Sequence, residues 1–276
     1  SIQWTTEENY YFQLMLMLIV VFHVVIGDKQ WFKSFYNRIG SSIVVDKKYA
    51  PMFHYIEELY QSSVYVQSSM QPLAPTDNSF LAIGDVHAIS TCNIRVTIAN
   101  QQFRITSLPL ENLSIYDLIS TKKNANKEMF YKFLVKAEQF RILMLVIGTY
   151  DCEKIIPKLA AKNIDSKQPA TDAISDLVNY YMILLTETRR KLPRFIPIIV
   201  HGAIPRFSWS IPIVERFNSE LKNMLKRDFL FISPFQSQST DGYFTTFGLK
   251  DNLPDARYPL TISSIMKKID LNIMNI

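Results

Sequence analysis

The order of apolar and polar positions divides the chain near residue 79. Before that point the main feature is an apolar run at residues 10–26, which follows the polar cap Thr5-Thr6-Glu7-Glu8 and therefore predicts a helix. After it, short apolar runs alternate with helical patterns, which indicates a parallel sheet covered by helices. Strands are predicted at 80–84, 94–98, 103–107, 142–148, 196–200 and 229–232, and helices at 51–60, 86–92, 127–140, 171–192, 212–227 and 260–269.

The polar, proline-bearing stretch at 67–79 is the best boundary between two parts of the chain. We therefore expect an N-terminal helical and aromatic extension with its linker over residues 1–78, and an α/β domain over residues 79–276. Three predicted strands are each followed by a glycine: Gly84, Gly148 and Gly202. In an open α/β sheet the carboxyl ends of the strands are where ligands bind, so this edge is the candidate site.

The sequence Gly84-Asp85-Val86-His87 resembles the first block of the SGNH (GDSL-type) hydrolases, in particular a bacterial branch that reads GDSH there. The resemblance spans about residues 79–270 and continues in Gly148-Thr149-Tyr150-Asp151-Cys152, which is similar to the third block. It implies a flavodoxin-like three-layer fold, and ester hydrolysis by a serine, an aspartate and a histidine, with glycine and asparagine as oxyanion donors.

Four functional positions of that family hold other residues in this chain. Val86 stands at the serine position, and its isopropyl group cannot attack a carbonyl. Leu110 or Glu111 stands at the second-block glycine, and Tyr150 replaces the asparagine. In the last block Asp255 is followed by Tyr258 at the histidine position. The resemblance therefore implies a catalytically inactive domain that is a binding or structural subunit of a larger assembly, without cofactor or metal.

The residues expected around the vestigial pocket come from all of these blocks. Asp85 is expected to hold its turn through backbone hydrogen bonds, Asp151 to brace the turn after its strand, and His201 to bond to backbone. His87 is expected to cap the following helix or to line the pocket. The full set is Gly84, Asp85, Val86, His87, Glu111, Gly148, Tyr150, Asp151, His201, Asp255 and Tyr258.

Two enzyme alternatives remain open. The first is an ester hydrolase for acylated substrates, carbohydrates among them, in which Ser90 is the nucleophile and His87 the base, although Ser90 lies a helical turn beyond the strand. The second is a calcineurin-like metallophosphoesterase, which also begins with GDVH; Asp85, His87, Asp151 and His201 would be its ligands. That family's Asn-His-Glu/Asp block is absent, and its second block would place an aspartate at Thr149.

The amino-acid composition limits the classes of partner that the protein is expected to bind. The net charge of +5 comes from scattered basic pairs rather than a basic stripe, so nucleic acid is not an expected ligand. The 13% aromatic content and the apolar N-terminal helix favour contact with other protein subunits, and Trp209 offers a surface for a glycan. The helix at 10–26 must be buried in this protein, in a partner, or in a membrane. Cys92 and Cys152 suggest free thiols in a reducing compartment, or one disulfide at most.

Overall fold

The computed structural model describes residues 5–28, 30–31, 33–35, 79–163, 165–205, 208–225, 229–234 and 266. The predicted helix at 51–60, most of the one at 260–269, and the last-block residues Asp255 and Tyr258 lie outside these ranges. The boundary placed at residue 79 stays a prediction, although the first strand of the sheet begins at Ser79.

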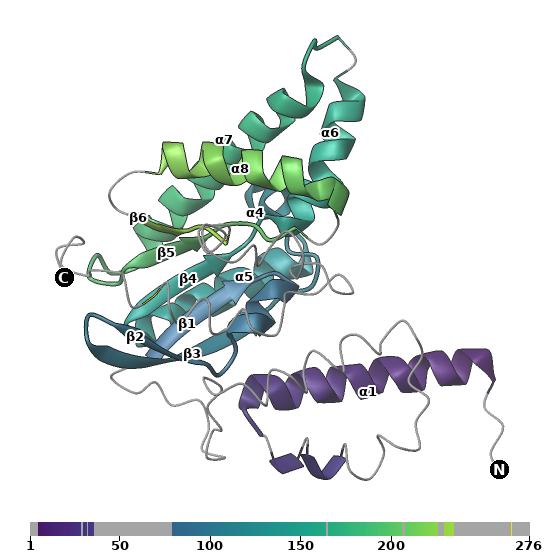
Figure 1. Cartoon of the computed structure of the whole chain (residues 1–276), viewed down its shortest axis with the longest axis vertical. Helices are drawn as coiled ribbons and strands as arrows, with labels where there is room; N and C mark the ends of the chain where they lie inside the picture. Colours follow the sequence, from purple (N-terminus) through teal and green to yellow (C-terminus); the bar gives the residue numbers. More distant parts are fainter. Residues whose placement is uncertain are drawn as a thin grey trace.

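One six-stranded sheet forms the centre of the molecule, in the order β2-β3-β1-β4-β5-β6 (Figure 1). All neighbouring strands run parallel except β2, which forms an antiparallel hairpin with β3. The strands are β1 (Ser79–Gly84), β2 (Arg95–Ile98), β3 (Gln101–Pro109), β4 (Ile142–Val146), β5 (Ile198–His201) and β6 (Phe229–Ile232). This order is the flavodoxin-like arrangement with a hairpin added at one edge, so the predicted α/β class is confirmed.

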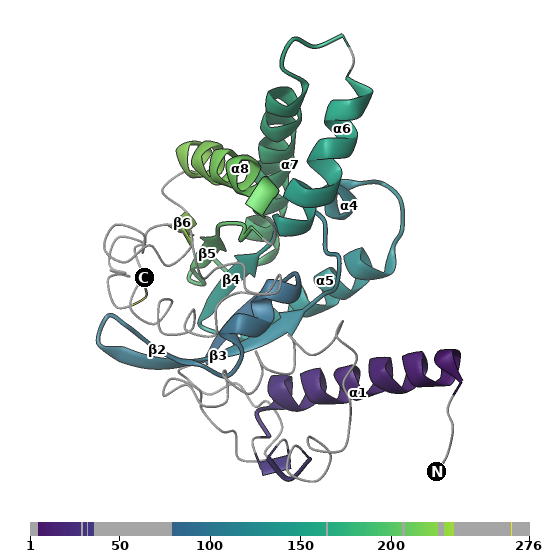
Figure 2. The same ribbon diagram turned by 45° about the vertical axis from the view of Figure 1, so that its right-hand side comes forward.

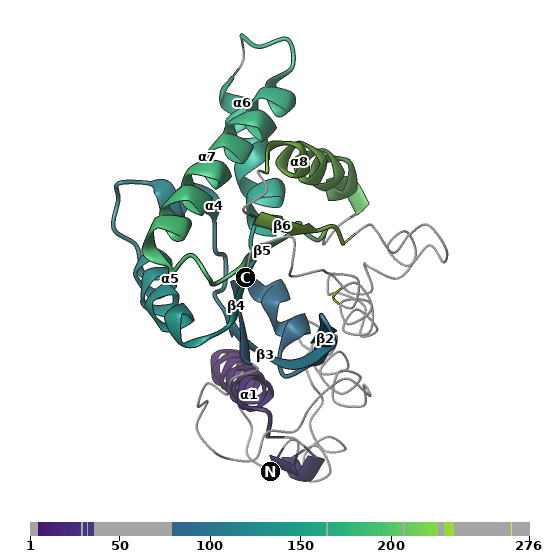
Figure 3. The ribbon, with the colours of Figure 1, turned by 90° about the vertical axis from the view of Figure 1, so that its left-hand side faces the viewer.

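The two faces of the sheet are covered differently. On one face Leu81, Leu143 and Ile198 pack against the α-helices, and α5 and α7 are seen on that side in Figure 3. On the other face Phe80 and Met144 pack with residues of the 3-10 helix η1 (Val86–Thr91), the hairpin and Met266. The central strands are therefore buried on both sides, which is why they appear in the sequence as unbroken apolar runs. The helices are α4 (Ile115–Ile119), α5 (Ala125–Lys136), α6 (Ile156–Lys162), α7 (Pro169–Lys191) and α8 (Ile211–Met224).

Three helical segments between β3 and α7 were not predicted from the sequence pattern. The helix α4 has five residues and begins at the cap Ser114, whose hydroxyl accepts a hydrogen bond from the Asp117 N–H. The second is a π-helical turn, Asp151–Ile155, called η3 here, which leads directly into the third, α6. All three are too short for a helical period to stand out from the surrounding residues.

The N-terminal helix α1 (Thr6–Ile26) is a complete helix with both ends capped. Thr5 and Glu8 form a reciprocal capping box, and Gly27 ends the helix in the left-handed conformation with φ 77°. The Asn93 amide, at the start of the hairpin, donates to the Val24 and Val25 carbonyl oxygens at 2.6 and 2.9 Å. The last turn of α1 is thus fastened beside β3, while its first turn lies away from the sheet (Figure 2). Among the described helices none is both long and apolar enough to cross a membrane.

Candidate functional site

The carboxyl ends of β1, β4 and β5 lie in one row. Gly84 is in register with Val146, and Val146 with His201. A Cβ atom at Gly84 would lie 2.1 Å from the Val146 carbonyl oxygen, so only glycine fits this close approach. The expected convergence of the glycine-terminated strands is confirmed, since Gly148 and Gly202 follow β4 and β5 at the same edge.

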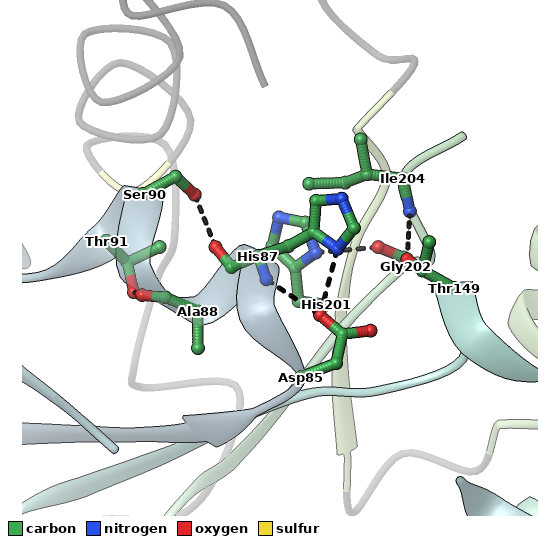
Figure 4. A network of polar contacts seen from close by, with 9 residues as sticks. All are labelled: Asp85, His87, Ala88, Ser90, Thr91, Thr149, His201, Gly202 and Ile204. Carbon is green, nitrogen blue, oxygen red and sulfur yellow. Dashed lines mark hydrogen bonds and ion pairs between the residues drawn. The ribbon is translucent and has the colours of Figure 1, made fainter. Parts of the chain in front are cut away.

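The turn after β1 is held by the Asp85 carboxylate (Figure 4). Its Oδ1 accepts from the His87 backbone N–H at 2.9 Å and from the ring Nδ1–H of His87 at 3.0 Å. Asp85 and His87 are 3% and 2% exposed. The expected bond from the backbone to Asp85 is therefore present, and Asp85 rather than His87 caps the following helix η1. The imidazole of His87 is fixed in orientation by a buried carboxylate, as in a catalytic Asp-His pair.

Val86 is the first residue of η1 and follows Asp85 at the tip of this turn. The nearest hydroxyl along the same helix belongs to Ser90. Its Oγ donates to the His87 carbonyl oxygen at 2.6 Å, and the residue is fully buried. The neighbouring Thr91 hydroxyl likewise donates to the Ala88 carbonyl oxygen, at 2.8 Å. As expected from its position, Ser90 is turned into its own helix rather than toward the strand ends.

His201, the last residue of β5, is buried beside Asp85 and His87 (Figure 4). Its Nδ1–H donates to the Gly202 carbonyl oxygen at 2.6 Å, which confirms the expected bond to backbone. Burial lowers the pKa of His201 to about 4, a shift that the Gly202 carbonyl and the Asp85 carboxylate oppose and His87 adds to. The His201 ring is therefore neutral at pH 7.

Asp151 is fully buried at the start of η3 and reaches across to another loop. Its carboxylate accepts from the Ser114 hydroxyl at 2.7 Å and from the backbone N–H groups of Ile115 and Tyr116 at 2.9 and 3.4 Å. It braces the start of α4 rather than the turn after its own strand. Desolvation raises the pKa of Asp151 to about 7, while these three hydrogen bonds oppose the shift.

The residues that stand in place of the oxyanion donors are Leu110 or Glu111 and Tyr150. The Leu110 backbone N–H donates to the Gly84 carbonyl oxygen at 2.7 Å, so Leu110 is the residue placed against the β1 turn. Glu111 is exposed, and its backbone carbonyl accepts from the Asn126 amide. Tyr150 is half-buried directly before η3, and Gly148 adopts a φ of 128° that favours glycine.

Two buried residues near the site carried no signal in the sequence. The Tyr181 hydroxyl is fully buried under the strand ends, where desolvation and the Asp85 and Asp151 carboxylates raise its pKa. The Asn218 side chain of α8 bonds both the N–H and the carbonyl oxygen of Ala203, at 2.8 and 2.9 Å. Each lies on the apolar face of a predicted amphipathic helix. From the sequence alone, a single polar group on such a face cannot be distinguished from an ordinary core residue.

The arrangement is poor in reactive groups. The Asp85 and His87 pair could polarise a hydroxyl or water, but the Ser90 hydroxyl next to it is bonded to backbone. Within the described ranges no three His, Cys, Asp or Glu side chains are grouped so as to hold a metal ion. Both oxygens of Asp151 bond to the α4 loop, and Asp85 bonds to His87, so the four expected ligands do not form one set.

Comparison with known proteins returned structural likenesses at low identity. No protein-family model matches the chain, and no curated protein has a similar sequence. A lipase from a goat rumen metagenome matches with a TM-score of 0.46 and 10% identity over 67% of this chain and 94% of that one. A carbohydrate esterase family 3 from Talaromyces cellulolyticus matches with a TM-score of 0.41 and 16% identity over 72% of this chain and 99% of that one. Likeness at this level does not decide the chemistry of the site.

Proposed function

We propose that the chain is a catalytically inactive SGNH-hydrolase-like domain that acts as a binding or structural subunit of a larger assembly. The observation that carries this proposal is the state of the turn after β1. Val86 occupies the position at which a nucleophile would stand, and the nearby Ser90 hydroxyl is buried and bonded to the His87 carbonyl oxygen.

A nucleophile at Ser90 would need two changes at once. Its hydroxyl would have to give up the 2.6 Å bond to His87, and a fully buried side chain would have to become accessible to substrate. Losing a bond to a buried carbonyl costs about 1 to 3 kcal/mol, because the oxygen is left without a donor. Each molecule would have to spend this free energy before Ser90 could attack a substrate, which argues against a serine mechanism at this position.

An ester hydrolase that uses water directly is the second candidate function. It is favoured by the 3.0 Å bond between Asp85 Oδ1 and His87 Nδ1, which orients the His87 ring as a general base. Its substrates would be acylated compounds, carbohydrates among them. With only 2% of His87 exposed, a substrate would reach this base only after a local rearrangement.

Hydrolysis of p-nitrophenyl acetate and p-nitrophenyl butyrate by the purified chain separates the two functions. We expect no rate above that of a heat-denatured sample, and no labelling of Ser90 by a fluorophosphonate probe. The variants His87→Ala and His201→Asn form a pair, since both remove a buried imidazole, but His87 bonds to the Asp85 carboxylate and His201 bonds to the Gly202 carbonyl oxygen. Turnover that is lost in His87→Ala and kept in His201→Asn would overturn the proposal in favour of the water mechanism.

Other protein subunits are the partners that the exposed apolar side chains fit best. A glycan is a further ligand class at the carboxyl edge. Trp209 stands in the 3-10 helix Ser208–Ser210, called η4, which follows β5, and its side chain is 51% exposed. Quenching of Trp fluorescence by added oligosaccharides, absent in Trp209→Ala, would support a glycan; unchanged fluorescence across neutral and acetylated sugars would exclude it.

A further inference from the structure

The Asp85 carboxylate uses only one of its two oxygens in the hydrogen bonds of the β1 turn. Both donors of His87, the backbone N–H and the ring Nδ1–H, bond to Oδ1 (Figure 4). Oδ2 is buried as well, and no described residue donates a hydrogen bond to it. A carboxylate oxygen buried without a donor costs free energy, because it has lost the hydrogen bonds that water gives it in the unfolded chain. Oδ2 therefore points to a further donor at this place.

Another buried polar group without a described partner is the Tyr181 hydroxyl on α7. Tyr181 is 0% exposed, and within the described ranges its hydroxyl neither donates nor accepts a hydrogen bond. Desolvation raises the pKa of Tyr181, and the Asp85 carboxylate adds more to this shift than Asp151 does. The hydroxyl therefore keeps its proton at neutral pH and can act as a donor.

The side chain of Asp85 lies on the face of the sheet that the α-helices cover. Its backbone is still extended, with φ −69° and ψ −170°, so the alternation along β1 continues through it. Asp85 thus follows Leu81 and Ile83, which pack against those helices. The Asp85 N–H donates to the Val146 carbonyl oxygen at 2.8 Å, which fixes Asp85 beside the end of β4.

Tyr181 approaches the end of β4 from α7 on the same face. It belongs to the same apolar cluster as Leu81 and Ile83. Its ring stacks on that of Phe217, with 6.4 Å between the centroids and 9° between the planes. Phe217 in turn lies against the turn after β4, because a Cβ atom at Gly148 would be only 2.9 Å from its ring. The two unpartnered groups are therefore enclosed by the same elements, β1, β4 and α7.

We propose that a water molecule enclosed between the β1 turn and α7 links Asp85 Oδ2 to the Tyr181 hydroxyl. The water donates a hydrogen to Oδ2 and accepts the hydrogen of the phenol, so both buried groups gain a partner. Buried polar groups hold water inside proteins in this way. Tyr181 is then a positioning residue, because through the water it fixes the carboxylate whose other oxygen orients His87.

The chemistry of the two groups selects water over an ion. The Asp85 carboxylate repels an anion, and a cation cannot accept the hydrogen that the Tyr181 hydroxyl donates. A metal ion also needs more ligands than these. Both oxygens of Asp151 bond to the α4 loop, and the described part of the chain groups no three His, Cys, Asp or Glu side chains for a metal. The link concerns only how the turn is held, so it is independent of whether His87 acts as a base.

A high-resolution crystal structure of the full chain tests for the water directly. We expect one peak of electron density within about 2.5 to 3.2 Å of both Asp85 Oδ2 and the Tyr181 hydroxyl oxygen. Tyr181→Phe keeps the ring that stacks on Phe217 and removes the hydroxyl, so the peak should weaken or disappear. A direct bond between the two side chains, no density between them, a peak with the coordination of a metal ion, or a peak unchanged in Tyr181→Phe would each overturn the proposal.

Proton NMR tests the positioning role. The Nδ1–H signal of His87 is identified by its loss in His87→Ala. In Tyr181→Phe the second oxygen of Asp85 loses its donor, so more negative charge stays on Oδ1 and the bond to His87 strengthens; we expect the signal to move downfield.

Tyr180→Phe is the matched control, because Tyr180 is the neighbouring, half-buried tyrosine on α7 and contacts Tyr116 instead. It should leave the His87 signal in place. Circular dichroism establishes that the variants are folded. A signal that stays in place in Tyr181→Phe, or that moves equally in both variants, would refute the positioning role.

Discussion

Two buried titratable groups near the strand ends should give the protein opposing dependences on pH. Burial raises the pKa of Asp151 from 3.8 to about 7 and lowers the pKa of His201 from 6.5 to about 4. Between pH 4 and 7 the folded protein keeps a proton on Asp151 that the unfolded chain has released, so the free energy of unfolding falls as pH rises. Between pH 4 and 6.5 the unfolded chain holds a proton on His201 that the folded protein excludes, so the free energy of unfolding rises with pH.

The size of the pH dependence follows from the single proton that each group binds or releases. Each contributes a slope of about 1.4 kcal/mol per pH unit within its window, and the two slopes have opposite signs. Between about pH 4 and pH 6.5 they nearly cancel in the wild type. Asp151→Asn should therefore become more stable relative to the wild type as pH rises, by about 2 to 3 kcal/mol over two pH units. His201→Asn, which keeps a donor near the Nδ1 position, should change by the same amount in the other direction.

Urea unfolding at several pH values, followed by tryptophan fluorescence, measures these differences. Differences between variant and wild type remove the contributions of all other carboxylates, which are common to both. Asp85 acts on both groups, and His87 acts on His201, so each stays in place in every variant. A difference that is flat with pH for either variant would refute the assigned protonation states, as would two variants that change in the same direction.

Three further outcomes test the packing of the site and of α1. Gly84→Ala should cost more than about 4 kcal/mol or prevent folding, because its Cβ would meet the Val146 carbonyl oxygen; thermal melting measures this, and a normal melting temperature would contradict it. Asn93→Gly, which keeps the left-handed backbone, should cost about 1 to 3 kcal/mol and expose the end of α1 to proteases. Burial raises the pKa of Cys92 to about 11 and holds that of Cys152 well above its usual range, so Ellman's reagent should label neither thiol at pH 8 until the chain is unfolded; rapid labelling of the folded protein would contradict this.

The sheet could be predicted from the sequence because its central strands are buried on both faces. Among these central strands β4 ends at Val146, two residues before the predicted end. The edge strand β6, which is only partly buried, was also predicted at 229–232, with the bounds that the structure shows. The placement of Gly84 at the carboxyl end of β1 also followed from local pattern alone. Two expectations remain untested because Asp255 and Tyr258 lie outside the described residues.

The network around the strand ends could not be predicted in the same way. Asp151 bonds to Ser114 and Ile115, which precede it by more than thirty residues, and no local period records such a contact. The helix α1 shows a related limit. Its composition is apolar on all sides, and only the burial of Val20 and Val24 in the structure reveals which side packs against the protein.

The hydrogen bonds of the β1 turn have a consequence for how such a domain can change over evolutionary time. Asp85 bonds to the backbone and ring of His87, and its carbonyl oxygen accepts from the Ala88 N–H. These bonds run past residue 86. The shape of the turn therefore does not depend on the side chain of residue 86, and that side chain can change during evolution while the turn is kept. A turn organised in this way keeps its shape whichever side chain stands at its tip.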